Sequence, residues 1–158
     1  MVGKNRIPFK LERLRKKAGV FFAQGQPLWG HFFISPVSAN HDGEETVLEL
    51  LMSGQRYVPF ETMDGQIVLI LISNIVKVLL EDNQHHMQRL ATEHINVELC
   101  FISGETMRGK VCFTMPETHS RLSDFLNQSL GFFYLEAEGQ LYLINHRHIV
   151  LIRPLTPP

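Results

Sequence analysis

The sequence predicts a mainly β protein with short helices, a β-rich α+β chain built from two tandem repeats of the order β-β-α-β-β-β. Three observations lead to this prediction. Apolar and polar residues alternate along 95–101, which is the period of a half-buried strand. Glycines and apolar residues recur at matching positions in the two halves of the chain. A short segment in each half, 45–53 and 119–127, has apolar residues spaced as on one face of a helix.

The two halves match over two stretches. Residues 20–36 match 99–115 at an offset of 79, and residues 47–78 match 121–152 at an offset of 74. The matches include glycines at turns, such as Gly65 with Gly139. The chain is therefore divided into a basic N-terminal arm, a first β repeat, a polar linker for which a helix is one alternative, a second β repeat and a short tail. These segments are 1–17, 18–81, 82–93, 94–155 and 156–158.

The secondary structure is predicted most clearly by the sequence of the second repeat. Its first strand covers 95–101, a turn follows at 103–106, and the second strand returns over 107–114. Gly109 lies inside that second strand, which predicts a bulge or a sharp bend. Leu122, Phe125 and Leu126 define the apolar face of the helix at 119–127. The remaining strands are expected at 132–135, 140–145 and 148–153, with a turn at 138–139 and a kink at 146–147.

The first repeat predicts matching elements. Its helix covers 45–53, has Leu48, Leu51 and Met52 on its apolar face, and ends at Gly54. Its last three strands are expected at 57–61, 66–72 and 75–80, with a turn at 64–65 and a kink at 73–74.

Three pairs of adjacent phenylalanines require both faces of the sheet to be covered. The pairs are Phe21-Phe22, Phe32-Phe33 and Phe132-Phe133, and neighbours on a strand point to opposite faces. The apolar run 67–72 has the same requirement. One short helix per repeat cannot cover both faces, so we expect the repeats to pack on each other or the chain to self-associate. Left uncovered, the run 67–72 is an aggregation hazard.

Each repeat has a glycine in its first hairpin turn, a glycine in the strand that follows, and a terminal strand–turn–strand segment. These residues are Gly25-Gln26, Gly30 and 66–78 in the first repeat, and 103–105, Gly109 and 140–152 in the second. This pattern resembles the small barrels of Sm-like and SH3-like proteins. The resemblance implies a small β-barrel or a rolled sheet for each repeat. The helix departs from the Sm-like pattern, because it lies between strands two and three rather than before strand one. The Asp and Asn with which Sm proteins bind RNA have no match in 111–116, so RNA binding is not carried over. The segments GKVCF and RLSDFLN are also similar to uncharacterised bacterial domains, which implies a fold without a function.

The composition bounds the class of protein. The chain has 158 residues, 44% of them apolar and 20% charged, which excludes wholesale disorder. Its longest apolar stretch, 67–72, has six residues, whereas a membrane-spanning helix needs about twenty. Charges interrupt the apolar residues that follow the basic start, so we expect no signal peptide. The cysteines Cys100 and Cys112 form no CxxC motif, and we expect a cytoplasmic, reducing setting.

Charge is distributed unevenly. Residues 1–17 carry seven basic side chains and one acidic side chain, whereas the remaining residues carry eight basic and fifteen acidic ones. The segment Lys10–Ala18 fits a short basic amphipathic helix. The arm is either a solvated tail resting on the acidic body or a contact for nucleic acid, an anionic surface or an acidic partner. Its candidate contact residues are Arg13, Arg15, Lys16 and Lys17.

Motifs that carry chemistry are absent from the sequence. It contains no GxxxxGK[ST], GxGxxG, GxSxG or HExxH pattern. The protein is therefore expected not to be an enzyme and to have no cofactor. His146 and His148 share one face of a predicted strand, but a metal site needs three or four converging ligands, so no metal is expected.

These observations favour a non-enzymatic protein-binding or scaffold (adaptor) protein, with a protein partner or self-association. The alternative is a nucleic-acid-binding small barrel that uses the basic arm for phosphate contacts. Trp29 lies beside a turn and is either a lid on the core or a contact anchor. The interface candidates are Trp29, Phe32 and Phe132.

Overall fold

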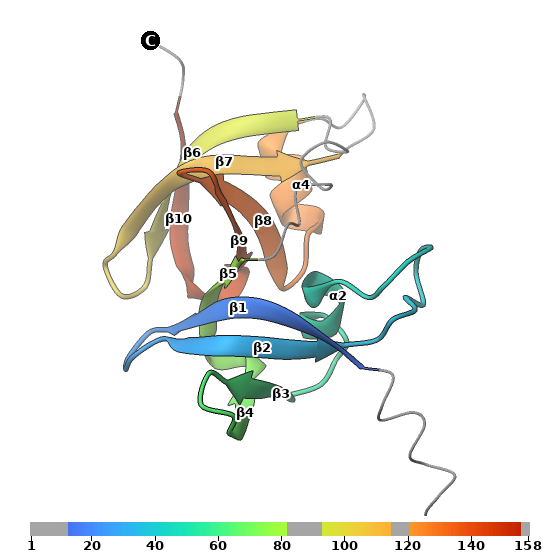
Figure 1. Ribbon diagram of the computed structural model, residues 1–158. Helices are drawn as coiled ribbons and strands as arrows, with labels where there is room; N and C mark the ends of the chain where they lie inside the picture. Colours follow the sequence, from blue (N-terminus) through green and yellow to red (C-terminus); the bar gives the residue numbers. More distant parts are fainter. Residues whose placement is uncertain (1–12, 82–92, 115–120, 156–158) are drawn as a thin grey trace, which may run out of the picture.

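The computed structural model describes residues 13–81, 93–114 and 121–155 (Figure 1). The tail and all of the linker except Glu93, which begins β6, lie outside the described residues. The order β-β-α-β-β-β occurs twice, as the sequence predicts. The first half consists of β1 (Leu14–Phe22), β2 (Leu28–Ile34), α2 (Val47–Leu51), β3 (Tyr57–Thr62), β4 (Ile67–Leu71), the 3-10 turn η2 (Ile72–Asn74) and β5 (Ile75–Leu80). The second half consists of β6 (Glu93–Phe101), β7 (Thr106–Phe113), α4 (Leu122–Gln128), β8 (Phe132–Ala137), β9 (Gln140–Asn145), the 3-10 turn η4 (His146–His148) and β10 (Ile149–Pro154).

The strands form one open antiparallel sheet of ten strands, in the order β10-β6-β7-β8-β9-β5-β1-β2-β3-β4. The mainly β class is confirmed, but of the two expected forms, a small barrel or a rolled sheet, the barrel is wrong, because the sheet does not close. Within each half the fifth strand pairs with the first, β5 with β1 and β10 with β6. Closing the first half would require β5 to pair with β4, but β5 pairs with β9 of the second half instead. This pairing joins the two halves, which are the lower and upper parts of Figure 1.

The pairing registers relate the two halves residue by residue. β1 and β2 correspond to β6 and β7 at an offset of 79. β4 and β5 correspond to β9 and β10 at an offset of 74. Strand β3, however, corresponds to β8 at 75, because the turn between Thr62 and Gln66 is one residue longer than the turn between Ala137 and Gln140. The single offset of 74 predicted for 47–78 is therefore wrong by one residue before this turn.

That one-residue shift corrects the predicted helix face. Val47, Leu50 and Leu51 are the buried residues of α2, whereas Met52 is 41% exposed. At an offset of 75 these three residues correspond to Leu122, Phe125 and Leu126 of α4, which the sequence assigns to the apolar face. Thr46 caps α2 by accepting a hydrogen bond from the Glu49 amide, while the Glu49 carboxylate accepts one from the Thr46 amide.

Gly109 does not form a bulge, because β6 and β7 pair in unbroken register through it. A Cβ atom at Gly109 would lie 2.6 Å from the Glu136 carbonyl oxygen, and one at the equivalent Gly30 would lie still closer to the Glu61 carbonyl oxygen. Both glycines therefore allow the next strand, β8 or β3, to approach closely.

The prediction of a helix over Lys10–Ala18 is also wrong for residues 13–18, the part of this segment that the structure describes. Strand β1 begins at Leu14 and pairs with β2 and β5. Ala18 and Val20 alternate into the core and are fully buried, which a strand achieves and a solvated basic helix would not.

Two apolar clusters form the interior, and β8 and β9 separate them. Phe132, Tyr134, Leu141 and Leu143 pack into the cluster of the first half. Phe133, Leu135, Ala137 and Ile144, which point to the opposite face of the same two strands, pack into the cluster of the second half. The expectation that the repeats pack on each other is therefore confirmed.

Polar contacts also join the halves. The buried Asn145 side chain donates a hydrogen bond to the Ile75 carbonyl oxygen at 2.8 Å and accepts one from the Arg147 amide. A ring nitrogen of His148 lies 2.9 Å from the Ser73 carbonyl oxygen. The Lys77 ammonium lies 5.1 Å from the centre of the Phe21 ring and 5.5 Å from the centre of the Tyr142 ring. Partial burial of this side chain lowers the pKa of Lys77.

Candidate protein-binding surface

Strand β4 is one edge of the sheet and is strongly apolar. Its five residues, Ile67–Leu71, include no charge and no proline. Ile67 is 56% exposed and Leu69 is 67% exposed. Edge strands of soluble proteins are usually protected by charges, proline or bulges, because their unpaired backbone groups accept further strands. β4 has none of these features, and no strand of the described residues pairs with its outer side, so its backbone and its apolar side chains face outward together.

The outer face of the β3–β4 hairpin extends this apolar edge. Tyr57 is 52% exposed, and Pro59 is half-buried beside it. Tyr57 pairs with Leu71 and Pro59 pairs with Leu69, so these residues lie on the same hairpin. We define the hairpin patch as Tyr57, Pro59, Ile67 and Leu69. It presents an aromatic ring and branched aliphatic side chains, which are suited to burial against a partner.

Strand β10 is the opposite edge of the sheet. Val150 and Leu151 are exposed on it. Arg153 is ion-paired with Glu98 of β6 at 2.5 Å, and Arg108 lies 3.2 Å from the same carboxylate. Hydrogen bonds from Arg108 and Arg153 lower the pKa of Glu98. The apolar part of β10 is thus open, and its C-terminal part carries a charge cluster.

Beside β10 the apolar residues of α4 form a groove. It has a volume of about 560 Å³ and is lined by Ile95, Leu122, Leu126, Ile152 and Pro154 among others. We call it the α4 groove. In α4 no residue is fully buried, so its apolar face is only partly covered.

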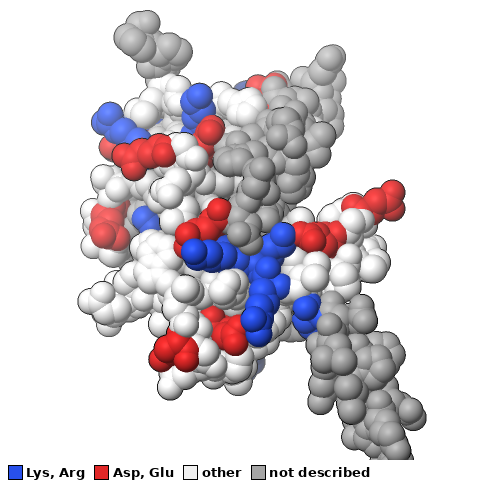
Figure 2. Space-filling view, in the orientation of Figure 1, with Lys and Arg blue, Asp and Glu red and all other residues white. Residues whose placement is uncertain are grey.

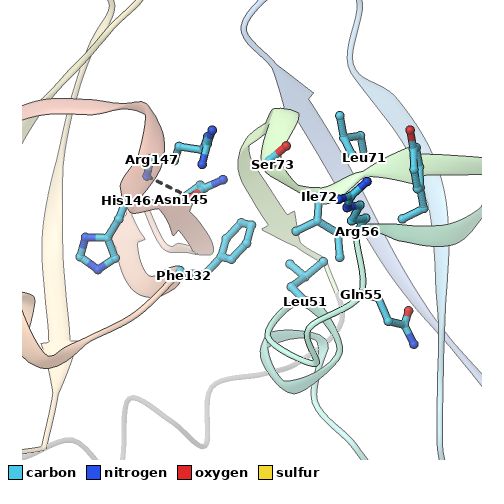
Figure 3. Close-up of a pocket in the computed structure, with 12 residues that line it drawn as sticks. Leu51, Gln55, Arg56, Leu71, Ile72, Ser73, Phe132, Asn145, His146 and Arg147 are labelled. Carbon is cyan, nitrogen blue, oxygen red and sulfur yellow. Dashed lines mark hydrogen bonds between the residues drawn. The ribbon is translucent and has the colours of Figure 1, made fainter.

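A second cavity, of about 870 Å³, lies where the two halves meet. Figure 3 shows Phe132 of the second half pointing towards Leu51 and Ile72 of the first. Arg56 and Arg147 also line the cavity and are exposed, and no acidic residue of the described chain lines it. The cavity is therefore an open, positively charged pocket at the junction.

His146 and His148, which the sequence places on one face of a strand, lie in the turn η4 and contact different residues. The His146 ring packs against Phe133, and its Nε2 atom lies 3.3 Å from the Ser129 hydroxyl. Burial lowers the pKa of His146. His148 contacts the first half instead. In residues 13–81, 93–114 and 121–155, no group of three or more His, Cys, Asp or Glu residues could hold a metal ion.

The three interface candidates from the sequence lie in different environments. Phe32 has no exposed surface and packs edge to face on Phe60 in the first core, so it is a core residue and not an interface residue. Phe132 is buried between the two halves. Trp29 is 40% exposed, packs edge to face on Phe21 and covers Gly19, and therefore acts as a lid with one open side.

The basic residues lie among acidic ones. Arg13 precedes β1 and is exposed, whereas the next three basic residues belong to β1. Their ion pairs are Arg15 with Glu61, Lys16 with Glu44 and Lys17 with Glu81. Figure 2 shows basic and acidic side chains side by side on this face. These cations therefore have partners within the molecule.

The free sheet edges were not among the residues singled out from the sequence. The apolar run 67–72 was the available signal, since it required a cover. Choosing β4 and β10 as the open edges requires the pairing of β5 with β9. This pairing joins residues 61 to 67 positions apart, from Leu80 with Leu141 to Lys77 with Ile144, and local patterns do not reveal it.

No helix in the described part of the chain has the length and apolar character needed to cross a membrane. Comparison of the chain with protein-family models, with curated proteins and with solved structures gives no match.

Proposed function

We propose that the protein is a non-enzymatic protein-binding or scaffold protein that binds a partner by adding a strand to an exposed edge of its sheet. The observation that carries the proposal is β4, an edge strand of five apolar residues whose outward side chains Ile67 and Leu69 are exposed. In strand addition, main-chain hydrogen bonds provide affinity and alternate side chains provide specificity.

The hairpin patch supports the same function. A bare edge offers only backbone hydrogen bonds, which contribute modestly because water competes for them. Here the edge borders Tyr57 and Pro59, so a bound strand would also cover apolar surface. Burial of apolar area is the larger favourable contribution in most protein association.

Binding of displayed peptides tests the proposal. A library of short extended peptides is selected on the wild-type chain, and the selected peptides are then measured against four proteins: wild type, Leu69→Lys, Leu151→Asp and Val37→Lys. Val37 is 72% exposed in the loop after β2 and serves as the matched control. We expect binding to wild type and Val37→Lys and its loss in one edge variant, with increased amide-exchange protection along that edge. Failure to select any peptide, or equal binding to all four proteins, contradicts the proposal.

The nucleic-acid alternative remains a prediction with less support. Three of the four basic contact candidates are ion-paired within the molecule, so binding phosphate would require breaking those pairs. Binding of a single-stranded oligonucleotide at increasing salt distinguishes the two functions, because phosphate contacts weaken steeply with salt whereas an apolar edge does not.

A further inference from the structure

The two halves are joined by β5 and β9, and an equivalent of each of these strands lies at an end of the sheet. β5 pairs with β9 in the register Lys77 with Ile144, Val78 with Leu143, Leu79 with Tyr142 and Leu80 with Leu141. β10 is the equivalent of β5, and β4 is the equivalent of β9. Each chain therefore contains one joined β5–β9 pair and, at its two ends, one unjoined copy of each strand type.

The equivalence of β5 and β10 extends to an irregularity. The pairing of β5 with β1 shifts in register between Phe21 and Phe22. The pairing of β10 with β6 shifts between Ile149 and Leu151, and Phe101, opposite Ile149, is the equivalent of Phe22. The two strands thus have the same local shape, and a strand that fits the edge of β5 has a similar edge to fit on β10.

The faces of the two hairpins show what is left uncovered. In the second half Phe132, Tyr134, Leu141 and Leu143 are at most 6% exposed, because they pack on the core of the first half. Their equivalents are Tyr57, Pro59, Ile67 and Leu69, the hairpin patch. Tyr57, Ile67 and Leu69 are each more than half exposed. The hairpin patch is therefore an apolar surface of the type that is buried at the junction, without the surface that buries it.

The receiving side recurs in the same way. Helix α2 lies against β8 at the junction, where Val47, Leu50 and Leu51 are buried. Figure 1 shows α2 between the two halves. The equivalent face of α4 is only partly covered and forms the α4 groove beside β10. The second half thus has the receiving groove and an edge strand, and no hairpin from residues 13–81, 93–114 or 121–155 occupies them.

We propose that a second copy of this chain fills this position, so that β4 and the hairpin patch of one chain dock on β10 and the α4 groove of the next. This inference rests on the proposed function and names its partner. Transfer of the β5–β9 register by the offset of 74 pairs Leu151 with Ile70, Ile152 with Leu69 and Arg153 with Val68. The contact joins unlike surfaces, so it repeats from chain to chain and either closes into a ring or extends as a filament.

Two features of β10 shape the contact. The Leu155 amide donates a hydrogen bond to the Asn96 carbonyl oxygen of β6. Because successive backbone groups of a strand point in opposite directions, those of Pro154 point away from β6, towards the free edge. Pro154 has no amide hydrogen there, so the last amide that β10 can donate to the next chain is that of Ile152. Leu151 is the equivalent of Lys77 in β5. In the proposed contact Leu151 lies beside Ile70 and Val68 of the next chain, the equivalents of Ile144 and Tyr142. The contact between chains is thus less polar than the internal one.

The mass of the assembly tests the proposal, measured by size-exclusion chromatography with light scattering over a wide range of concentration. One variant, Leu69→Lys, blocks β4, and another, Leu151→Asp, blocks β10. Val37→Lys adds the same charge as the first variant at an exposed residue of the loop after β2, outside both edge strands. We expect wild type and Val37→Lys to reach at least twice the chain mass of 18.2 kDa, and each edge variant alone to be monomeric.

Mixing the two edge variants gives the decisive result. Leu69→Lys keeps an intact β10 and Leu151→Asp keeps an intact β4, so an equimolar mixture should form a dimer that grows no further. A variant that dimerises alone indicates pairing of like edges and overturns the head-to-tail contact. Circular dichroism spectra of the variants identify any that fail to fold, and Leu69→Ser and Leu151→Ser then replace them.

Failure of this proposal is distinguishable from failure of the proposed function. If wild type is monomeric at every concentration, the head-to-tail contact is wrong. Selected strand peptides that still bind such a monomer at β4 leave the protein-binding function in place. A monomer that binds no strand peptide contradicts both.

Discussion

Leu69 and Leu143 occupy equivalent positions in β4 and β9, yet Leu143 is fully buried and Leu69 is 67% exposed. The two strands have the same place in their hairpins, although the turn before β4 is one residue longer than the turn before β9, and different surroundings lie beyond them. Leu143 faces the core of the first half, to which its strand is joined through β5. The contrast defines the open end of the molecule, because the same residue type in the same local structure has an apolar cover in one case and none in the other.

This relationship predicts very different costs for the same substitution. Leu143→Ala should destabilise the protein by about 2–5 kcal/mol, since it removes buried methyl groups and leaves a cavity. Leu69→Ala should change the free energy of unfolding by less than about 0.5 kcal/mol. Urea unfolding at a chain concentration low enough to keep the protein monomeric measures both. Equal costs would mean that Leu69 is covered within its own chain.

The sequence predicted element types well because they depend on local patterns. The alternation over 95–101 and the kinks at 73–74 and 146–147 correspond to β6, η2 and η4. The one-residue shift before Gly65 was missed, because the matched glycines align only the end of the turn. A shift of one residue changes which face a strand side chain occupies. The offset of 74 places Phe132 opposite Val58, a core residue, whereas the pairing registers relate it to the exposed Tyr57.

The candidate surface was only partly predictable for a different reason. The sequence shows that the run 67–72 and the phenylalanine pairs need covers on two faces. It does not show that β9 covers the first core while β4 covers nothing, because this depends on the long-range pairing of β5 with β9. Phe32 illustrates the limit. It was an interface candidate by residue type, and its position in β2 points it fully into the core.

A second prediction concerns the equivalent glycines Gly30 and Gly109. In Gly30→Ala or Gly109→Ala the new methyl group would collide with the backbone carbonyl of Glu61 or Glu136 on the neighbouring strand. The backbone cannot move aside as a flexible side chain does. Each substitution should therefore lower the free energy of unfolding by about 1–3 kcal/mol. Urea unfolding compares them with Ser53→Ala, which replaces an exposed residue after α2. Wild-type stability in either variant would show that the strands are farther apart than described.

A third prediction concerns pH and the loop that precedes α2. Burial raises the pKa of Glu49, but hydrogen bonds from Asn40, the Thr46 amide, Ser38 and His41 outweigh it and lower the pKa to about 2. A carboxyl group with a lowered pKa in the folded state stabilises the protein above its unfolded pKa of 4.5. That contribution is lost as the pH falls through this value towards 2.

Glu49→Gln should therefore unfold more easily than wild type at pH 7, with the difference shrinking as the solution is acidified from about pH 5 towards pH 2. Thermal unfolding at a series of pH values measures the difference. Glu138→Gln, an exposed residue in the β8–β9 turn, is the control and should show no comparable trend. A difference that stays constant down to low pH would contradict the assignment of the charge at Glu49.

The fourth prediction tests whether the two halves unfold together. Asn145 lies in the second half, and its buried amide donates to the Ile75 carbonyl oxygen in the first. Asn145→Asp replaces that donor with an acceptor and sets a carboxylate against a carbonyl oxygen. An unsatisfied buried group costs about 1–3 kcal/mol, and a charged one costs more.

Trp29 is the only tryptophan of the chain and lies in the first half, so its fluorescence reports on that half. Because the β5–β9 pairing and the shared apolar cluster join the halves, fluorescence and far-ultraviolet circular dichroism should give one coincident transition. Asn145→Asp should shift both signals to lower urea by the same amount. If the substitution shifts the circular dichroism transition and leaves Trp29 fluorescence unchanged, the halves unfold as independent units, and the ten-stranded sheet is not a single cooperative structure.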